Sequence, residues 1–339
     1  MDEQEKQIVG TKKSGFNVWI LFLVVLIITL ITGGYFYLGS LKKPSSLSKT
    51  ESGSASKNDE KWVRDKDVVS ANITSSDTHK ISDSLYRMYY MAEGGFVLAE
   101  STDAKTFNSP TQTNVTEDRG YFMSNPAVLK ISDGKWVMIY EQQPMKKPGQ
   151  ANSPKPNGPE SQRNLYLAAS PDGKSFTKYG KVLDSAEKDD YFASVPDLVL
   201  LPDNSIQMFY VSGGNAIASA ISIDEGKTWT RQEGYCLEDG AVDPDVARKS
   251  TGGKMDEWTM YYSNIDPGRN AIYKATSSNG KTWKSAGKVL ERENEASSIV
   301  DPDVVEGVNN DLVMFFGEFA GDSTAAQGRP TLYRATLSR

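Results

Sequence analysis

The most regular feature of the chain is a short apolar segment in which a Met is followed two residues later by Tyr or Phe. Residues two apart lie on the same face of a β-strand, so each copy predicts one strand of a sheet. The five copies begin at Met88, Met138, Met208, Met260 and Met314. Twelve positions before four of these Met residues stand Ser76, Pro126, Pro196 and Pro302, and Pro244 precedes the remaining copy at a longer distance because of an insertion.

A second repeat marks turns. It reads Ser-x-Asp/Asn, usually with a Gly, then Lys, Thr or Ser and an aromatic residue, and it occurs at 101–107, 170–176, 222–229 and 277–283. Asp or Asn beside Gly permits a tight hairpin turn, and the Thr can hydrogen-bond to the Asp. This pattern resembles the Asp-box of sialidases and other β-propellers. The resemblance implies a structural turn between the outer two strands of a blade, away from the active face.

The two repeats together predict an all-β fold, a five-bladed β-propeller. Four strands at a period near 50 residues are typical of a propeller blade. The expected blades are 75–115, 122–184, 193–238, 240–291 and 297–339. The last blade lacks a fourth strand, and we expect residues 62–69, which have strand character, to supply it and close the ring.

The N-terminal part has a different character. Residues 16–38 form an uncharged run of 23 residues, long enough for a transmembrane helix with a little tilt. Residues 39–60 are rich in Ser and Lys and predict a disordered, flexible linker. We therefore expect a cytoplasmic tail at 1–15, a single-pass anchor in the lipid bilayer, and the propeller at 61–339 on the extracytoplasmic side of the cell membrane. A cleaved signal peptide and a buried core helix are the alternatives.

Composition narrows the class of protein further. The net charge is −6, so the chain has no basic field for nucleic acid, and we expect none as a partner. One cysteine, Cys236, excludes an intrachain disulfide, and with one histidine, His79, it cannot form the usual Cys/His zinc site. We expect a monomer with no metal or other cofactor, and leave a structural calcium ion in the central channel as an open alternative.

Acidic residues gather at the start of the innermost strands. Alignment of the copies places five residues in one ring: Ser75, Asn125, Val195, Asp243 and Asp301. Two residues further on, and so on the same strand face, stand Asp77, Ala127, Asp197, Asp245 and Asp303. Crowded carboxylates repel, so some must raise their pKa or find a donor or cation, and paired carboxylates with separated pKa values serve glycoside hydrolysis. Simple capping of the strands is the competing interpretation.

Residues 62–339 resemble the five-bladed propeller glycoside hydrolases of the arabinanase, β-xylosidase and fructosidase clan. In that clan an Asp before Pro is the general base, a second Asp-Pro tunes the pKa, and a Glu shortly before Pro is the general acid. The segment 194–198 resembles the blade between the general base and the pKa-tuning Asp. This implies that Asp243 is the pKa-tuning residue and that Asp301 replaces the Glu that is the general acid. Asn125 then occupies the base position and cannot accept a proton, so Glu141 is a candidate to replace it.

The resulting assignment has two sets of residues. The candidate catalytic residues are Asp243, Asp301, Glu141 and Glu318. The candidate substrate-binding residues are Asp77, Asn125, Asp197, Asp245, Asp303, Arg163, Arg269 and Arg329.

Three functions follow from these residues, with carbohydrate or a cell-surface glycan as the partner. The first is a membrane-anchored glycosidase-like propeller that acts on or binds polysaccharide through carboxylates around the channel. The second is a non-catalytic propeller that binds glycan or protein, which Asn125 favours. The third is a sialidase-like enzyme, in which three Arg residues clamp the substrate carboxylate; sialidases have six blades, whereas the repeats predict five.

Overall fold

The computed structural model describes residues 61–71, 73, 75–145, 162–249, 257–266, 270–293, 297–320 and 331–338. All of them belong to one compact unit, residues 58–339. The expected tail, membrane segment and linker (1–15, 16–38 and 39–60) lie outside the described residues. Within the described part of the chain, no helix has the length and apolar character needed to cross a membrane.

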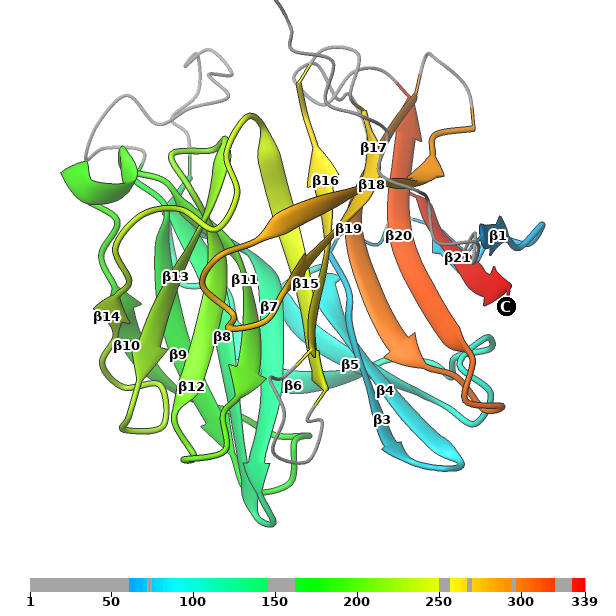
Figure 1. Cartoon of the computed structure of the whole chain (residues 1–339). Helices are drawn as coiled ribbons and strands as arrows, with labels where there is room; N and C mark the ends of the chain where they lie inside the picture. Colours follow the sequence, from blue (N-terminus) through cyan, green and yellow to red (C-terminus); the bar gives the residue numbers. More distant parts are fainter. Residues whose placement is uncertain are drawn as a thin grey trace, which may run out of the picture. The chain divides into compact units, whose positions relative to one another are not determined.

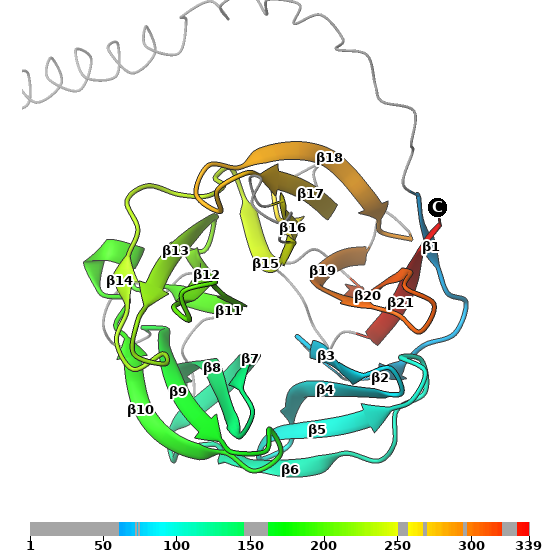
Figure 2. The same ribbon diagram turned by 60° about the horizontal axis from the view of Figure 1, so that its bottom comes forward.

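Five antiparallel sheets surround a central axis, as Figure 2 shows, and the predicted five-bladed propeller is confirmed. Blade 1 contains β3 (Asp77–Ser82), β4 (Leu85–Ala92), β5 (Gly95–Ser101) and β6 (Thr111–Thr116). Blade 2 contains β7 (Tyr121–Ser132), β8 (Lys135–Pro144), β9 (Asn164–Ser170) and β10 (Thr177–Leu183). Blade 3 contains β11 (Ala193–Leu200), β12 (Ile206–Ser212), β13 (Ala216–Ser222) and β14 (Thr230–Arg231). Blade 4 contains β15 (Ala241–Lys249), β16 (Glu257–Asn264), β17 (Ala271–Ser277) and β18 (Lys284–Glu291).

Blade 5 is built from both ends of the described chain. It contains β19 (Ser297–Glu306), β20 (Leu312–Ala320), β21 (Thr331–Ser338) and the closing strand β1 (Lys61–Arg64), while β2 (Ser70–Ala71) adds to β21. Figure 1 shows β1 beside β21, and the antiparallel register pairs Lys61 with Ser338 and Arg64 with Ala335. The predicted closure is thus confirmed, and it leaves no open edge on β21.

The recurring Met residues lie in the second strand of each blade and are almost fully buried, at 0–1% exposure. Their neighbours are buried too, because each blade packs between two others. On β16, Met260 packs toward blade 3, whereas Tyr261 packs toward blade 5. Both faces of the strand are therefore covered, which explains the nearly continuous apolar character of these segments.

The Asp-box segments form the expected turns between the third and fourth strands of blades 1 to 4. In the first, the Asp103 carboxylate accepts the backbone N–H groups of Lys105 and Thr106, both at 2.8 Å. In the third, the Thr228 hydroxyl donates to Asp224 at 2.7 Å. These carboxylates satisfy the backbone donors of their own turns, so they stabilise the fold and take no part in the channel site.

Candidate active site

A small cavity opens at the end of the channel where the innermost strands begin. Each of the five blades contributes three consecutive residues to its lining: Ser75–Asp77, Asn125–Ala127, Val195–Asp197, Asp243–Asp245 and Asp301–Asp303. Its volume is about 30 Å³, enough for a water molecule but not for a sugar ring.

The first residue of each triplet has a left-handed backbone. The φ angles are 45° at Ser75, 53° at Asn125, 43° at Val195, 53° at Asp243 and 53° at Asp301. In blades 2 to 5 this residue lies in a β-bulge, where the register between the first two strands shifts. A bulge redirects one side chain, and a positive φ at β-branched Val195 costs about 1–3 kcal/mol. The fold retains this strain in all five blades, as is typical of a functional site.

The third residue of four triplets is an Asp with a structural task, whereas blade 2 has Ala127 at this position. Asp197 accepts the backbone N–H of Val246 in the next blade at 2.8 Å, and Asp77 accepts that of Val128 in the same way. Asp303 makes the same kind of contact to blade 1 by accepting the N–H of Thr78 at 3.1 Å. Asp245 makes the matching bond to the next blade. These four carboxylates tie neighbouring blades together, so strand capping, the competing interpretation, accounts for their position.

Burial changes the charge state of this ring. Desolvation, with the nearby charge of Asp77, raises the pKa of Asp197 and of Asp303 to about 7. Desolvation also raises the pKa of Asp245 well above its usual range, with further contributions from Asp197 and Asp303. A proton shared among such groups relieves their repulsion. The ring consequently carries fewer charges at neutral pH than its carboxylates would carry in water.

Asp243 and Asp301 are the two acidic side chains that the bulges redirect. The backbone N–H of Asp301 donates to the Asp243 carboxylate at 3.4 Å and to the Ser263 hydroxyl at 3.2 Å, and the Ser75 hydroxyl donates to Asp301 at 2.9 Å. Desolvation, followed by the charge of Asp301, raises the pKa of Asp243 to about 8. Desolvation raises the pKa of Asp301 to about 6. The pair therefore supplies one protonated and one ionised carboxyl near neutral pH.

Glu141 lies beside the ring, in β8, with 0% of its side chain exposed. It accepts hydrogen bonds from the Asn125 amide at 2.8 Å, the Arg163 guanidinium at 3.2 Å and the Ser194 hydroxyl. Asn125 thus occupies the expected base position and also holds Glu141. Three donors thus surround this carboxylate, and the protein shields it from solvent.

Glu318 is held by a different set of donors, next to the closing strand. It contacts Arg64, Ser297 and the backbone N–H of Glu293. Burial opposes ionisation, but the hydrogen bonds of Ser297 and Arg64 prevail and lower the pKa of Glu318. An ionised carboxylate cannot protonate a leaving group, so the structure speaks against Glu318 as the general acid.

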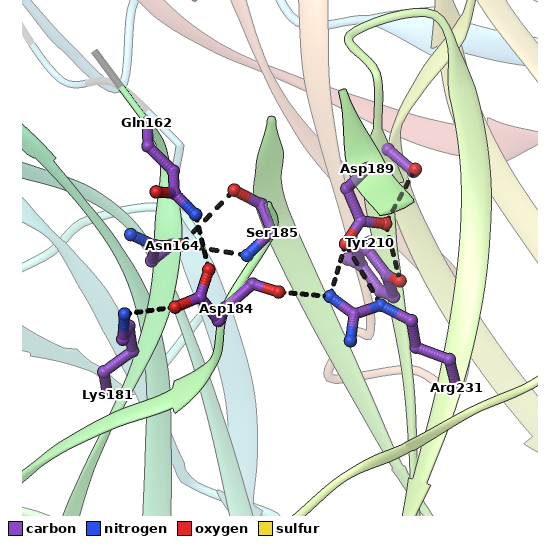
Figure 3. A network of polar contacts seen from close by, with 9 residues as sticks. Gln162, Asn164, Lys181, Asp184, Ser185, Asp189, Tyr210 and Arg231 are labelled. Carbon is purple, nitrogen blue, oxygen red and sulfur yellow. Dashed lines mark hydrogen bonds and ion pairs between the residues drawn. The ribbon is translucent and has the colours of Figure 1, made fainter. Parts of the chain in front are cut away.

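Arg163 is placed at the site by an aromatic contact. Its guanidinium lies over the Phe192 ring, 4.3 Å from the centroid. Phe192 follows a short 3₁₀ turn, η2 (Glu187–Asp189), which buried Asp189 anchors by accepting from Tyr210 at 3.0 Å and from Arg231 at 3.1 Å. Figure 3 shows this network. The other two predicted arginines, Arg269 and Arg329, lie outside the described residues.

Three contacts escaped the sequence analysis. Ser194 donates to Glu141 and Ser263 accepts the backbone N–H of Asp301, but a serine in a strand carries no signal of its own. The Nε2 of His79 donates to the Asp77 carboxylate at 3.0 Å. Burial opposes its protonation, yet the charge of Asp77 prevails and raises the pKa of His79. Its position in the first inner strand was visible in the sequence, but its partner was not.

A metal ion finds no prepared site among the described residues, where no three His, Cys, Asp or Glu side chains are grouped to hold one. The carboxylates of the ring face backbone N–H groups and hydroxyls instead.

The described strands form a five-bladed propeller with a ring of acidic residues at one end of its channel. No family model and no curated protein matches the chain. Among solved structures, a thermostable family-43 glycoside hydrolase is 16% identical, with a TM-score of 0.54, over 79% of this chain and 89% of that one. The endo-arabinase from Bacteroides thetaiotaomicron is 12% identical, with a TM-score of 0.59, over 80% and 96%.

A further similar structure is the arabinanase from Bacillus subtilis. It is 14% identical, with a TM-score of 0.54, and the match covers 82% of this chain and 97% of that one. At these identities the likeness establishes the fold alone. It agrees with the five-bladed propeller that the repeats predicted, and any activity must be argued from the residues of the site.

Proposed function

We propose that this protein is a glycoside hydrolase that acts on polysaccharide, with Asp243 and Asp301 as its working carboxyl groups. The observation that carries this proposal is the pair itself. Two bulged strands direct both side chains to the channel mouth, and the pKa of Asp243 is raised to about 8 and that of Asp301 to about 6. Hydrolysis of a glycosidic bond requires one proton donor and one anionic group on opposite sides of the scissile bond.

The chemistry follows from the two charge states. The protonated member of the pair donates to the leaving glycosidic oxygen, and the ionised member removes a proton from the attacking water or stabilises the positive charge that develops on the sugar. Ser75 and Ser263 orient Asp301 through its carboxylate and its backbone N–H. Two structural neighbours, an endo-arabinase and an arabinanase, support arabinan as the first substrate to test.

The test is turnover on a polysaccharide panel that contains arabinan and xylan, with the Asp243→Asn and Asp301→Asn variants. Loss of a general acid or base lowers the rate by about 10²–10⁴-fold, and we expect each variant to lose this much. Asp172→Asn serves as a matched control, because Asp172 belongs to an Asp-box turn and accepts the N–H of Lys174 at 2.8 Å. Unchanged turnover in Asp243→Asn and Asp301→Asn would reject these roles.

A second candidate function is glycan binding without cleavage. Asn125 favours it, because an amide at the expected base position donates to Glu141 at 2.8 Å and cannot take a proton from water. Binding of arabinan or xylan with no turnover by the unmutated protein would select this function. A sialidase-like activity has less support, since the described residues form five blades whereas sialidases have six.

We also propose that residues 16–38 anchor the chain in the cell membrane as a single span, with the propeller on the extracytoplasmic side and residues 39–60 as a tether. The uncharged run of 23 residues supports this arrangement. N-terminal sequencing of the native protein is the test. A mature chain that starts after about residue 39 would show cleavage and overturn the anchor.

A further inference from the structure

Ala127 leaves a gap in the contacts that tie the blades together around the channel. In the other four blades an Asp at this position accepts a backbone N–H of the next blade. The seam between blades 2 and 3, where Figure 2 shows β7 and β8 beside β11, is bridged at the channel mouth instead. There Ser194 of β11 donates to Glu141 of β8 and accepts from the Asn125 amide at 3.3 Å. A buried polar network thus replaces the missing tie.

Glu141 is the centre of this network, and its side chain is closed to any ligand. It is 0% exposed, and both of its carboxyl oxygens already accept hydrogen bonds, from Arg163, Asn125 and Ser194. The sequence makes Glu141 a candidate to replace the general base, but a side chain with no exposed surface cannot touch a sugar or an attacking water. Glu141 can therefore act on a ligand only through a neighbour that reaches the cavity.

Asn125 is that neighbour, because it lines the cavity at the channel mouth. Its amide nitrogen donates to Glu141 at 2.8 Å and to Ser194 at 3.3 Å, which occupies both of its N–H groups. Ser194 is only 1% exposed, so the nitrogen points into the protein. The carbonyl oxygen lies on the other side of the planar amide, toward the cavity. Reversal of the amide would set this oxygen against the oxygens of Glu141, so Glu141 fixes its orientation.

We propose that Glu141 is a positioning residue: it holds the Asn125 amide so that the carbonyl oxygen accepts a hydrogen bond from a hydroxyl group of a bound sugar. This inference rests on the proposed function in that the ligand is a glycan, but it does not depend on hydrolysis. The cavity, at about 30 Å³, admits a group of the size of water, such as a hydroxyl, while the sugar ring stays outside.

A neutral acceptor fits this place better than a charged one. Desolvation raises the pKa of Asp301, across the mouth, to about 6, and the charge of Glu141 adds to this rise. A carboxylate at position 125 would bring a further negative charge to the same mouth and would face Glu141 directly. An amide accepts the hydrogen bond of a hydroxyl without that charge.

The test is isothermal titration of the full chain with arabinotetraose and with xylotetraose, in a double-mutant cycle. Asn125→Ala removes the acceptor, and Glu141→Gln allows the amide to reverse, so each is expected to weaken binding of the tighter ligand about tenfold. When Asn125→Ala is already present, Glu141→Gln should have no additional effect on affinity, because Glu141 acts only through Asn125. Losses that add up in the double variant would overturn the proposal, and so would unchanged affinity in either single variant.

Two further variants separate this role from a general effect on the fold. Asn204→Ala replaces an exposed Asn with the same left-handed backbone, φ 63° against 53° at Asn125, in a turn at the opposite end of blade 3, and it should retain binding. If Glu141→Gln does not fold, Ser194→Ala takes its place in the cycle. It loosens the amide but leaves Glu141 paired with Arg163, and it should weaken binding by about three- to tenfold. Full affinity in Ser194→Ala would overturn the proposal.

The failure of this role and the failure of hydrolysis give different results. Where turnover occurs, Asn125→Ala should raise KM and leave kcat within about twofold, whereas Asp243→Asn should lower kcat. Binding without turnover would reject the hydrolase, and the cycle of affinities would still support or overturn the role of Glu141. Absence of binding of both oligosaccharides to the unmutated protein would overturn this inference.

Discussion

Replacement of Asp243 by Asn is expected to stabilise the propeller at high pH while it removes a working group of the proposed enzyme. Burial and the charge of Asp301 raise the pKa of Asp243 from 3.8 to about 8. The folded protein therefore keeps a proton that the unfolded chain releases between about pH 4 and pH 8. Over this window the free energy of unfolding falls as the pH rises, and above it the full cost remains.

The magnitude follows from the size of this shift. At about 1.4 kcal/mol per pKa unit, the whole shift corresponds to about 6 kcal/mol. Solvent at the channel mouth screens part of this cost, so we expect Asp243→Asn to gain about 1–3 kcal/mol at pH 9. At pH 4, where the folded carboxyl is protonated, the variant should match the unmutated protein. An Asn side-chain oxygen can still accept the N–H of Asp301, so the local structure is retained.

Urea denaturation followed by tryptophan fluorescence at pH 4, 7 and 9 measures the effect, because Trp136 and Trp258 are buried. Asp172→Asn is the control with the opposite sign. Hydrogen bonds from the backbone of Lys174 and Ser175 lower the pKa of Asp172, so this variant should lose stability at neutral pH and lose less as the pH falls. A loss of stability in Asp243→Asn that is equal at all three pH values would refute the reasoning.

Two further predictions concern the contacts that hold the ring and the site together. Arg64→Ala leaves Glu318 buried without its ion pair and uncovers the Phe316–Tyr333 pair, so we expect a loss of about 3–5 kcal/mol in thermal or urea unfolding; a loss below about 1 kcal/mol would contradict this role. Asp189→Ala removes the acceptor of Tyr210, Ser212 and Arg231 and should cost about 2–4 kcal/mol, with Asp203→Ala on an exposed turn as the control. Equal losses in these two variants would show that the network of Figure 3 adds nothing to an ordinary turn.

The sequence by itself determined the fold, because the same short sequence patterns recur from blade to blade in a propeller. The Met-x-aromatic strands and the Asp-box turns depend on residues close in the chain, and the number of their repeats predicts the number of blades. The closing strand was also visible, since the fifth blade lacked a strand and residues 62–69 had the pattern of one. The aligned ring at the channel mouth followed from the same register, with Asp243 and Asp301 in equivalent positions.

Only the tertiary structure decided what each carboxylate does. Asp197 and Asp303 occupy aligned positions at which the sequence predicts substrate-binding residues, yet they accept N–H groups from the next blade. The sequence of one strand does not reveal which backbone groups of the next blade lie beside it. The charge of Glu318 depends on Arg64, 254 positions away in the chain. The left-handed backbone conformation of Val195 and Asp301 cannot be predicted from the residue types Val and Asp. Burial, long-range partners and backbone direction set the pKa values of this site, and all three arise when distant strands pack around one axis.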